Sequence, residues 1–143
     1  MLNRLFFLTF LFLFSSNNWA SQSQKIGQLE VHYSAFPSTF LAPIVAKEYQ
    51  LPRSRQIGLI NITVLDTKNP NKPAVTAQVQ GYAKNLLGQR KSLNFKLITE
   101  GDNHYYLAQV RHRNEENITF YIEVFRGKQQ GQLQFKQTFY TEP

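Results

Sequence analysis

Apolar and polar residues alternate strictly over VTAQVQGYAK, residues 75–84 of the 143-residue chain. Successive side chains of a β-strand point to opposite faces of a sheet, so this two-residue period is typical of a strand with one buried and one wet face. The apolar positions are Val75, Ala77, Val79, Gly81 and Ala83, and the polar ones are Thr76, Gln78, Gln80, Tyr82 and Lys84. The stretch therefore predicts a strand that packs one side against a hydrophobic core.

The same alternation recurs before and after this stretch. We expect seven strands in all, centred on residues 29–33, 60–65, 75–84, 92–97, 106–110, 118–124 and 133–139. Prolines and glycines mark the turns between them at residues 69–73, 100–103 and 126–131. Short strands at this spacing predict an all-β fold, an antiparallel immunoglobulin-like β-sandwich of about seven strands, with a partly closed barrel as the alternative.

One segment breaks the two-residue period. Leu41, Val45 and Tyr49 recur every four residues, with Phe40 and Ile44 beside them, and this spacing is typical of one face of a helix. We expect one short helix after the first strand, and we expect its apolar stripe to close an end or an edge of the sandwich.

The ends of this helix are indicated by four residues. Ser38 or Thr39 can cap its start, because a hydroxyl accepts hydrogen bonds from the free N–H groups of a first turn. Pro43 fits only that first turn, where its missing N–H does least harm. The helix is expected to end before Pro52.

Residues 1–20 have the features of an export signal that is removed after Ala20. Arg4 provides the positive start, and residues 5–14 form an apolar run interrupted only by Thr9. A membrane-spanning helix needs about 20 apolar residues, so this run is too short to anchor the protein. We expect an exported chain with no stable membrane anchor after signal cleavage and a single β-sandwich domain over residues 21–143.

Composition narrows the choice of partners. Signal cleavage would remove Arg4 alone among the sixteen basic and nine acidic residues, so fifteen basic residues would remain and the formal charge would be +6. Such a charge favours anionic partners, whereas dispersed basic residues in an exported protein do not indicate nucleic-acid binding. The chain has no cysteine, which excludes thiol catalysis, thiolate metal sites and disulfides.

Histidines and carboxylates do not form a recognisable catalytic pattern. His32, His104 and His112 lack the spacing that brings metal ligands together, and we expect them to be exposed polar residues at strand ends or on wet faces. We expect no cofactor, no metal and no enzymatic activity, because no nucleophile–base pair, paired carboxylates or phosphate-binding loop is evident. The alternative is a small hydrolase or metal-dependent enzyme that uses the region of His104, His112 and Glu115 or Glu116.

The first candidate binding surface is the hairpin connection from Asn85 to Arg90. It contains Leu86 and Leu87 beside several basic residues, although loops are usually polar. We expect the two leucines to fold back over the end of the core. The alternative is an apolar tip with a basic rim that contacts a partner or a membrane surface.

The second candidate surface is the corner at Arg53 and Arg55, which follows the predicted helix. A solvated loop is the simpler interpretation. The alternative is an anion-recognition corner, because a guanidinium group binds carboxylate or phosphate through two parallel hydrogen bonds.

Several short segments resemble a known family. They are VHYSAFPSTFL at residues 31–41, GLINI at 58–62, NLLGQ at 85–89, YYLA at 105–108 and FYT at 139–141. Over about residues 25–142 the chain resembles the small exported proteins of proteobacteria that are catalogued as a domain of unknown function. The resemblance implies a periplasmic β-sandwich of the Gram-negative envelope and carries no assigned activity, cofactor or catalytic residue.

These observations favour an exported, periplasmic protein that acts as a non-catalytic binding or accessory module of the cell envelope. Its partner is expected to be an envelope protein or an anionic ligand. A structural protein attached to an anionic envelope surface is a further alternative, and its attachment would weaken as salt rises.

Overall fold

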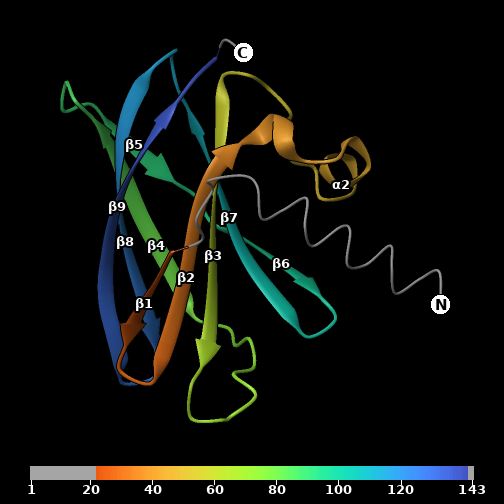
Figure 1. Cartoon of the computed structure of the whole chain (residues 1–143), viewed down its shortest axis with the longest axis vertical. Coiled ribbons are helices and arrows are strands. Elements are labelled where there is room, and N and C mark those ends of the chain that lie inside the picture. The colour runs from red at the N-terminus through yellow and green to blue at the C-terminus, as the bar shows by residue number, and fades with distance from the viewer. Residues whose placement is uncertain (1–21, 142–143) are drawn as a thin grey trace.

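The computed structural model describes residues 22–141, so the predicted export signal at residues 1–20 lies outside the described residues. Within the described part, nine strands form two antiparallel sheets that pack face to face (Figure 1). The strands are β1 (Gln22–Ile26), β2 (Leu29–Pro37), β3 (Ile57–Asp66), β4 (Gln78–Asn85), β5 (Arg90–Leu93), β6 (Lys96–Glu100), β7 (Asn103–Arg111), β8 (Glu116–Arg126) and β9 (Gln129–Phe139). None of the helices in residues 22–141 is long and apolar enough to span a membrane.

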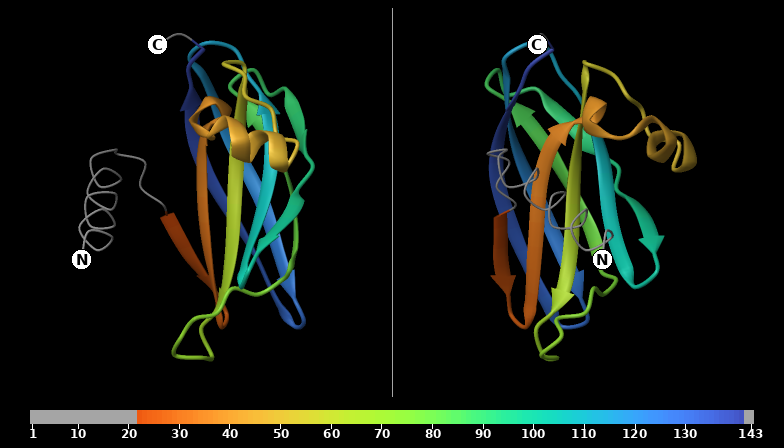
Figure 2. Two further views of the ribbon diagram at one scale, coloured as in Figure 1. Left: turned by 90° about the vertical axis from the view of Figure 1, so that its right-hand side faces the viewer. Right: turned by 45° about the vertical axis from the view of Figure 1, so that its right-hand side comes forward.

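The predicted antiparallel β-sandwich is confirmed. One sheet has five strands in the order β1-β2-β3-β7-β6, and the other has four in the order β5-β4-β8-β9. Most strands run along the long axis of the molecule, so the connections between them gather at its two ends (Figure 2).

The core lies between the sheets and is built from the apolar side of each strand. Phe120 lies at its centre, with its ring centroid 5.0 Å from that of Phe135 and 6.3 Å from that of Phe139, which it meets edge-on. Burial of each such side chain contributes about 1.5–3 kcal/mol to the stability of the folded chain. The large aliphatic side chains of this core that are fully buried are Leu29, Val31, Ile60, Ile62, Val64, Ile118, Ile122 and Val124.

Two differences account for nine strands where about seven were expected. β1 is exposed apart from Ile26, so no apolar alternation marks it, and it forms by pairing with β2. The strand expected over residues 92–97 is divided at Asn94 and Phe95 into β5 and β6, which belong to different sheets. Alternation shows which face of a strand is buried but not which sheet the strand joins.

Part of the stretch at residues 75–84 precedes a regular strand. β4 begins at Gln78, and residues 75–77 cross between the sheets. The backbone N–H of Val75 donates to the carbonyl of Val64 (2.8 Å), and the Tyr106 hydroxyl both accepts from the N–H of Ala77 and donates to its carbonyl, each at 2.8 Å. A tyrosine of β7 thereby replaces the ladder hydrogen bonds that this segment lacks.

The expected helix is present, but the prediction of its cap was wrong. A 3-10 turn, η1 (Ser38–Phe40), precedes the helix α2 (Pro43–Glu48), and Pro43 lies in the first turn as expected. Residue 42 is an alanine and cannot cap through its side chain. The Ser38 hydroxyl instead accepts from the N–H of Ser54 (2.9 Å) and donates to its carbonyl (2.8 Å), which closes the loop between β2 and β3.

The helical segment lies beside the outer face of the five-stranded sheet, near one end of it (Figure 2). Lys96 of β6 donates to the Tyr49 carbonyl (2.8 Å), and the Tyr49 hydroxyl donates to Glu100, a hydrogen bond that raises the pKa of Tyr49 to about 12. The expectation that the segment closes an edge is met here, because β6 is an edge strand. The apolar stripe is only partly covered, and Ile44 is 76% exposed.

Candidate functional site

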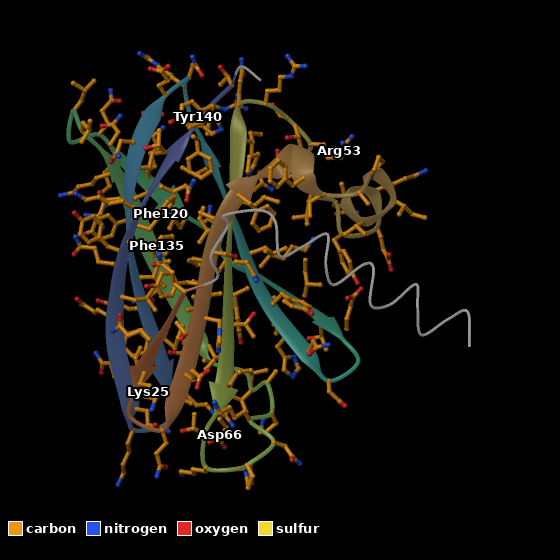
Figure 3. All side chains as sticks on the ribbon, viewed as in Figure 1. Lys25, Arg53, Asp66, Phe120, Phe135 and Tyr140 are labelled. Atoms are coloured by element: carbon orange, nitrogen blue, oxygen red, sulfur yellow. The ribbon has the colours of Figure 1, made fainter. Side chains whose placement is uncertain are left out.

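Five basic residues gather at one end of the sandwich, which we call the basic end. Figure 3 labels Arg53 near this end and Asp66 near the opposite end. The connection before β3, the start of β5 and the end of β7 meet here with the start of β8. The basic residues are Arg53, Arg55, Lys91, Arg111 and Arg113, and the nearby carboxylates are Glu115 and Glu116.

A cavity of about 720 Å³ opens at the basic end. Its polar lining includes Lys91, Arg111, His112, Arg113 and Glu116. Most of these residues lie at or next to the ends of paired strands, so the two sheets hold the cavity walls in place.

Lys91 connects the two sheets at this cavity. Its ammonium group donates to the Arg111 carbonyl (2.5 Å), at the end of β7, and to the Glu116 carboxylate (3.1 Å), at the start of β8. β7 belongs to the five-stranded sheet and β8 to the four-stranded one. One partly buried cation therefore satisfies groups from both layers of the sandwich.

Glu116 is held as a carboxylate. Burial raises the pKa of Glu116, but hydrogen bonds from the Asn85 amide (2.9 Å), the Arg113 backbone N–H (3.0 Å) and Lys91 outweigh burial and keep the pKa below its ordinary value. Because its oxygens accept these three hydrogen bonds, the group has a positioning role and little capacity to act as a proton acceptor.

His112 is buried, so the expectation that it is an exposed histidine was wrong. It is 4% exposed, and its ring stacks on Phe139 with the centroids 4.7 Å apart. Its Nδ1 lies 2.9 Å from the Arg113 carbonyl oxygen, which only accepts, so Nδ1 carries the proton in this contact. Every second residue of β7 is buried, and this alternation continues past the end of the strand to His112. The imidazole ring therefore lies in the core beneath the cavity.

The corner at Arg53 and Arg55 is divided between two roles. The Arg53 guanidinium donates to the carbonyls of Leu41 (2.8 Å) and Thr39 (3.3 Å), so it fixes the turn before the helix. Arg55 is exposed at the basic end. Arg53 therefore has a structural role that neither sequence interpretation included, and Arg55 remains a candidate for anion binding.

The hairpin between β4 and β5 presents its leucines to solvent. The Asn85 side-chain oxygen accepts from the N–H groups of Leu87 (3.1 Å) and Gln89 (2.9 Å), and Gly88 adopts a positive φ of 79°. Leu86 and Leu87 are each 82% exposed, so the prediction that they cover the core was wrong. The asparagine turn directs both side chains outward, and they form an apolar tip beside the basic end.

Arg90 does not belong to this tip. Its guanidinium carbon lies 3.8 Å from the ring centroid of Tyr82, on the outer face of the four-stranded sheet. Arg90 was expected to act with Asn85, Leu86 and Leu87, but the structure separates its side chain from theirs.

The residues of the alternative enzymatic site do not converge. His104 lies at the start of β7 and contacts the Thr99 hydroxyl (3.0 Å), whereas His112 follows the other end of the same strand. Eight residues of extended strand span about 26 Å. Within residues 22–141, no group of three or more histidines and carboxylates could hold a metal ion.

Arg111 and Arg113, on either side of His112, are not among the binding residues predicted from the sequence. Alternate residues of a strand share a face, so the order Arg111-His112-Arg113 at the end of a strand was a signal for two guanidinium groups around one cavity. Carboxylate and phosphate groups are the ligands that this arrangement suits.

Comparison with known proteins provides the family. No curated protein matches the chain. A crystal structure of a DUF4426 family protein from Pseudomonas aeruginosa is similar to it, with 32% sequence identity, a TM-score of 0.76 and coverage of 89% of this chain and 100% of that one. Residues 23–142 match the family described as Domain of unknown function (DUF4426). The chain therefore belongs to the DUF4426 family.

Proposed function

We propose that this protein is an exported, non-catalytic binding module of the cell envelope, located in the periplasm, which holds an anionic group of an envelope partner at its basic end. The observation that carries the proposal is the cavity of about 720 Å³ lined by Arg111, Arg113 and Lys91. The features of residues 1–20 support export.

The charge balance at the cavity favours an anion. Lys91 and Glu116 form an ion pair at 3.1 Å, so each offsets the charge of the other. Arg111 and Arg113 remain on the rim, and Arg55 lies nearby on the same end. An exposed guanidinium pair on a rigid frame attracts a carboxylate or phosphate and orients it through paired hydrogen bonds.

The hydrogen bonds at the cavity support a binding role over catalysis. Glu116 accepts from three donors, and the Nδ1 atom of His112 is occupied by the Arg113 carbonyl. A general base needs a free lone pair within reach of a substrate proton. These contacts stabilise the cavity and leave recognition to the arginines.

The binding test compares two charge reversals of equal size. Arg111→Glu with Arg113→Glu changes the basic end, and Lys68→Glu with Lys128→Glu changes the opposite end by the same amount. With polyglutamate as the probe at about 0.15 M salt, we expect the first pair to weaken binding at least tenfold and the second less than twofold. Equal weakening by both pairs would show that net charge alone is responsible.

The location is tested separately. Osmotic-shock fractionation of expressing cells should release the protein with the periplasmic markers, and N-terminal sequencing should begin at Ser21. Retention in the cytoplasmic fraction with Met1 intact would refute export.

A second candidate function is attachment to an anionic membrane surface, favoured by the exposure of Leu86 and Leu87 beside basic residues. An apolar tip inserts between headgroups while cations bind the anionic lipids around it. Leu86→Ser with Leu87→Ser should then abolish sedimentation with phosphatidylglycerol vesicles and leave polyglutamate binding unchanged. If the double variant sediments with the vesicles as much as the unaltered protein does, attachment to a membrane surface through the two leucines is excluded.

A further inference from the structure

The outer face of the four-stranded sheet carries a second cavity, of about 550 Å³. All four strands contribute to its lining, and the sheet occupies the left-hand side of Figure 1. The outward-facing residues of this sheet form rows across the strands, because paired residues on neighbouring antiparallel strands share a face. Three adjacent rows differ in their chemistry.

The middle row holds two tyrosines. Tyr82 of β4 and Tyr121 of β8 are direct partners, and their rings are 5.0 Å apart between centroids with 20° between the planes. Arg90 lies over the Tyr82 ring at 3.8 Å, and Gln134 of β9 pairs with Tyr121 on its other side. The tyrosines lie on the water side of the sheet and add no packing to the core. Because Tyr121 stacks on one face of Tyr82 and Arg90 covers the other, the aromatic face left for a ligand is the side of Tyr121 that points away from Tyr82.

The row on one side is built from hydrogen-bond acceptors. Gln80, Glu123 and Gln132 are partners across three strands. The amide nitrogens of Gln80 (3.1 Å) and Gln132 (2.9 Å) donate to the two oxygens of the Glu123 carboxylate. Within residues 22–141, no side chain donates to the side-chain oxygens (Oε1) of Gln80 and Gln132, although the Gln24 side chain donates to the backbone carbonyl of Gln132 (2.9 Å). The row thus holds the Glu123 carboxylate between two glutamine side-chain oxygens, and all of these oxygens can accept hydrogen bonds from the hydroxyl groups of a ligand.

The row on the other side is basic. Lys84, Thr119 and Lys136 are partners across β4, β8 and β9, and Arg90 of β5 pairs with Lys84. These residues lie two positions from the tyrosine row on their strands, so they share its face at a spacing of about 7 Å. Acceptors, aromatic rings and cations therefore follow one another along the sheet.

We propose that this face binds a saccharide that carries acidic groups. A sugar ring packs against the outer face of Tyr121, because the C–H groups of a sugar pack against aromatic rings. Its hydroxyls donate to Glu123 and to the two glutamine oxygens. Its acidic group, a carboxylate or a phosphate, reaches the cations of the basic row.

Glu123 favours a saccharide over single-stranded nucleic acid, which also stacks on aromatic residues beside cations. The Glu123 carboxylate lines the cavity beside the tyrosines. It repels a backbone that carries a phosphate on every nucleotide, whereas it accepts hydrogen bonds from neighbouring hydroxyls of a sugar. The site is separate from the basic end, so the failure of either proposal leaves the other standing.

The experiment is titration calorimetry of the full chain with four probes. Hexagalacturonate presents carboxylates, phosphomannopentaose presents a phosphate, galactohexaose is neutral, and oligouridylate represents nucleic acid. We expect at least one acidic saccharide to bind with a Kd below 5 mM and at least tenfold more tightly than the neutral one. The acidic saccharide that binds shows whether the recognised group is a carboxylate or a phosphate. No binding of either acidic saccharide below 5 mM, or tighter binding of oligouridylate, overturns the proposal.

Three variants distinguish specific saccharide binding from a general attraction of anions to positive charge. Tyr121→Ala should weaken binding at least tenfold, and Tyr140→Ala, which changes an exposed tyrosine outside the cavity, less than twofold. Glu123→Gln makes the protein more positive, yet we expect it to weaken saccharide binding about fivefold because the carboxylate accepts the sugar hydroxyls. Tighter binding by Glu123→Gln overturns the proposal. Unchanged melting temperatures of the three variants attribute the losses to the site.

Discussion

Gly58→Ala is expected to strain the contact that supports the basic end. Gly58 lies in β3 under the ring of Phe139, and an added Cβ would lie 2.6 Å from Cζ and 2.9 Å from Cδ1 of that ring, and closer still to Cε1. Phe139 is 2% exposed and stacks on His112, so its ring has little room to move aside. The substitution adds one methyl group and tests the contact between β3 of the five-stranded sheet and β9 of the four-stranded sheet.

The magnitude follows from two opposing effects. Overpacking of a tight core costs about 1–3 kcal/mol, and the confined ring places this contact at the upper end. Replacement of glycine in a strand returns about 0.5–1 kcal/mol of backbone entropy. We expect a net loss of about 2 kcal/mol, which lowers the melting temperature by roughly 8 °C for a domain of this size.

Urea unfolding followed by far-ultraviolet circular dichroism measures the loss. Phe139→Leu alone should cost about 1–2 kcal/mol, but it removes the ring atoms that the new methyl meets. The double variant should therefore be more stable than the sum of the single losses predicts, by at least about 1 kcal/mol. Gly101→Ala is the control for additivity. The φ of 57° at Gly101 makes an alanine there cost about 1–2 kcal/mol, but its Cβ meets nothing within 4 Å in the described structure, so this loss should simply add to that of Phe139→Leu. Additive losses for Gly58→Ala and Phe139→Leu would refute the proposed contact.

Three further predictions concern the hairpin tip, the carboxylate at the basic end and the bridge before β4. Leu86→Ser with Leu87→Ser should leave the melting temperature within about 2 °C, since exposed residues contribute little to stability, and a larger fall would show that the leucines pack in solution. Because the folded state lowers the pKa of Glu116, its stabilising effect is present above the ordinary glutamate pKa and is lost as pH falls through the lowered value. The fall in unfolding free energy below about pH 4.5 should be smaller in Glu116→Gln, and an identical pH profile would count against the hydrogen bonds assigned to it. Tyr106→Phe should cost about 1–3 kcal/mol because the N–H and carbonyl of Ala77 lose their shared partner, and unchanged urea unfolding would contradict that role.

The fold class and the position of the helix could be predicted because both depend on local periodicity. Six of the seven expected segments correspond to single strands, although β4 begins only at Gln78, and Pro43 marks the helix start. β1 could not be predicted, since four of its five residues are exposed and only pairing with β2 orders them. The switch between β5 and β6 was equally hidden, because residues 92–97 alternate in the same way whichever sheet each half joins.

The candidate site was predicted only in its outline. Asn85 and Arg55, predicted on two separate surfaces, both lie at the basic end, whereas Arg90 contacts Tyr82 and Arg53 fixes a turn. The leucine tip faces solvent because Asn85 accepts two backbone hydrogen bonds, and a residue pattern does not show which donors an asparagine will find. Arg111, Arg113 and the buried His112 form the cavity through contacts between strands that are distant in the chain.

The amino-acid order by itself determined which residues face a core, where the turns lie and how much positive charge the chain carries, because each of these depends on neighbours within a few positions. Only the tertiary structure decided that two arginines and a lysine meet around one cavity, and that two tyrosines, a glutamate and three glutamines line another. The physical reason is strand pairing, which brings residues tens of positions apart to about 5 Å from one another. The register of that pairing is set by the packing of the whole sandwich.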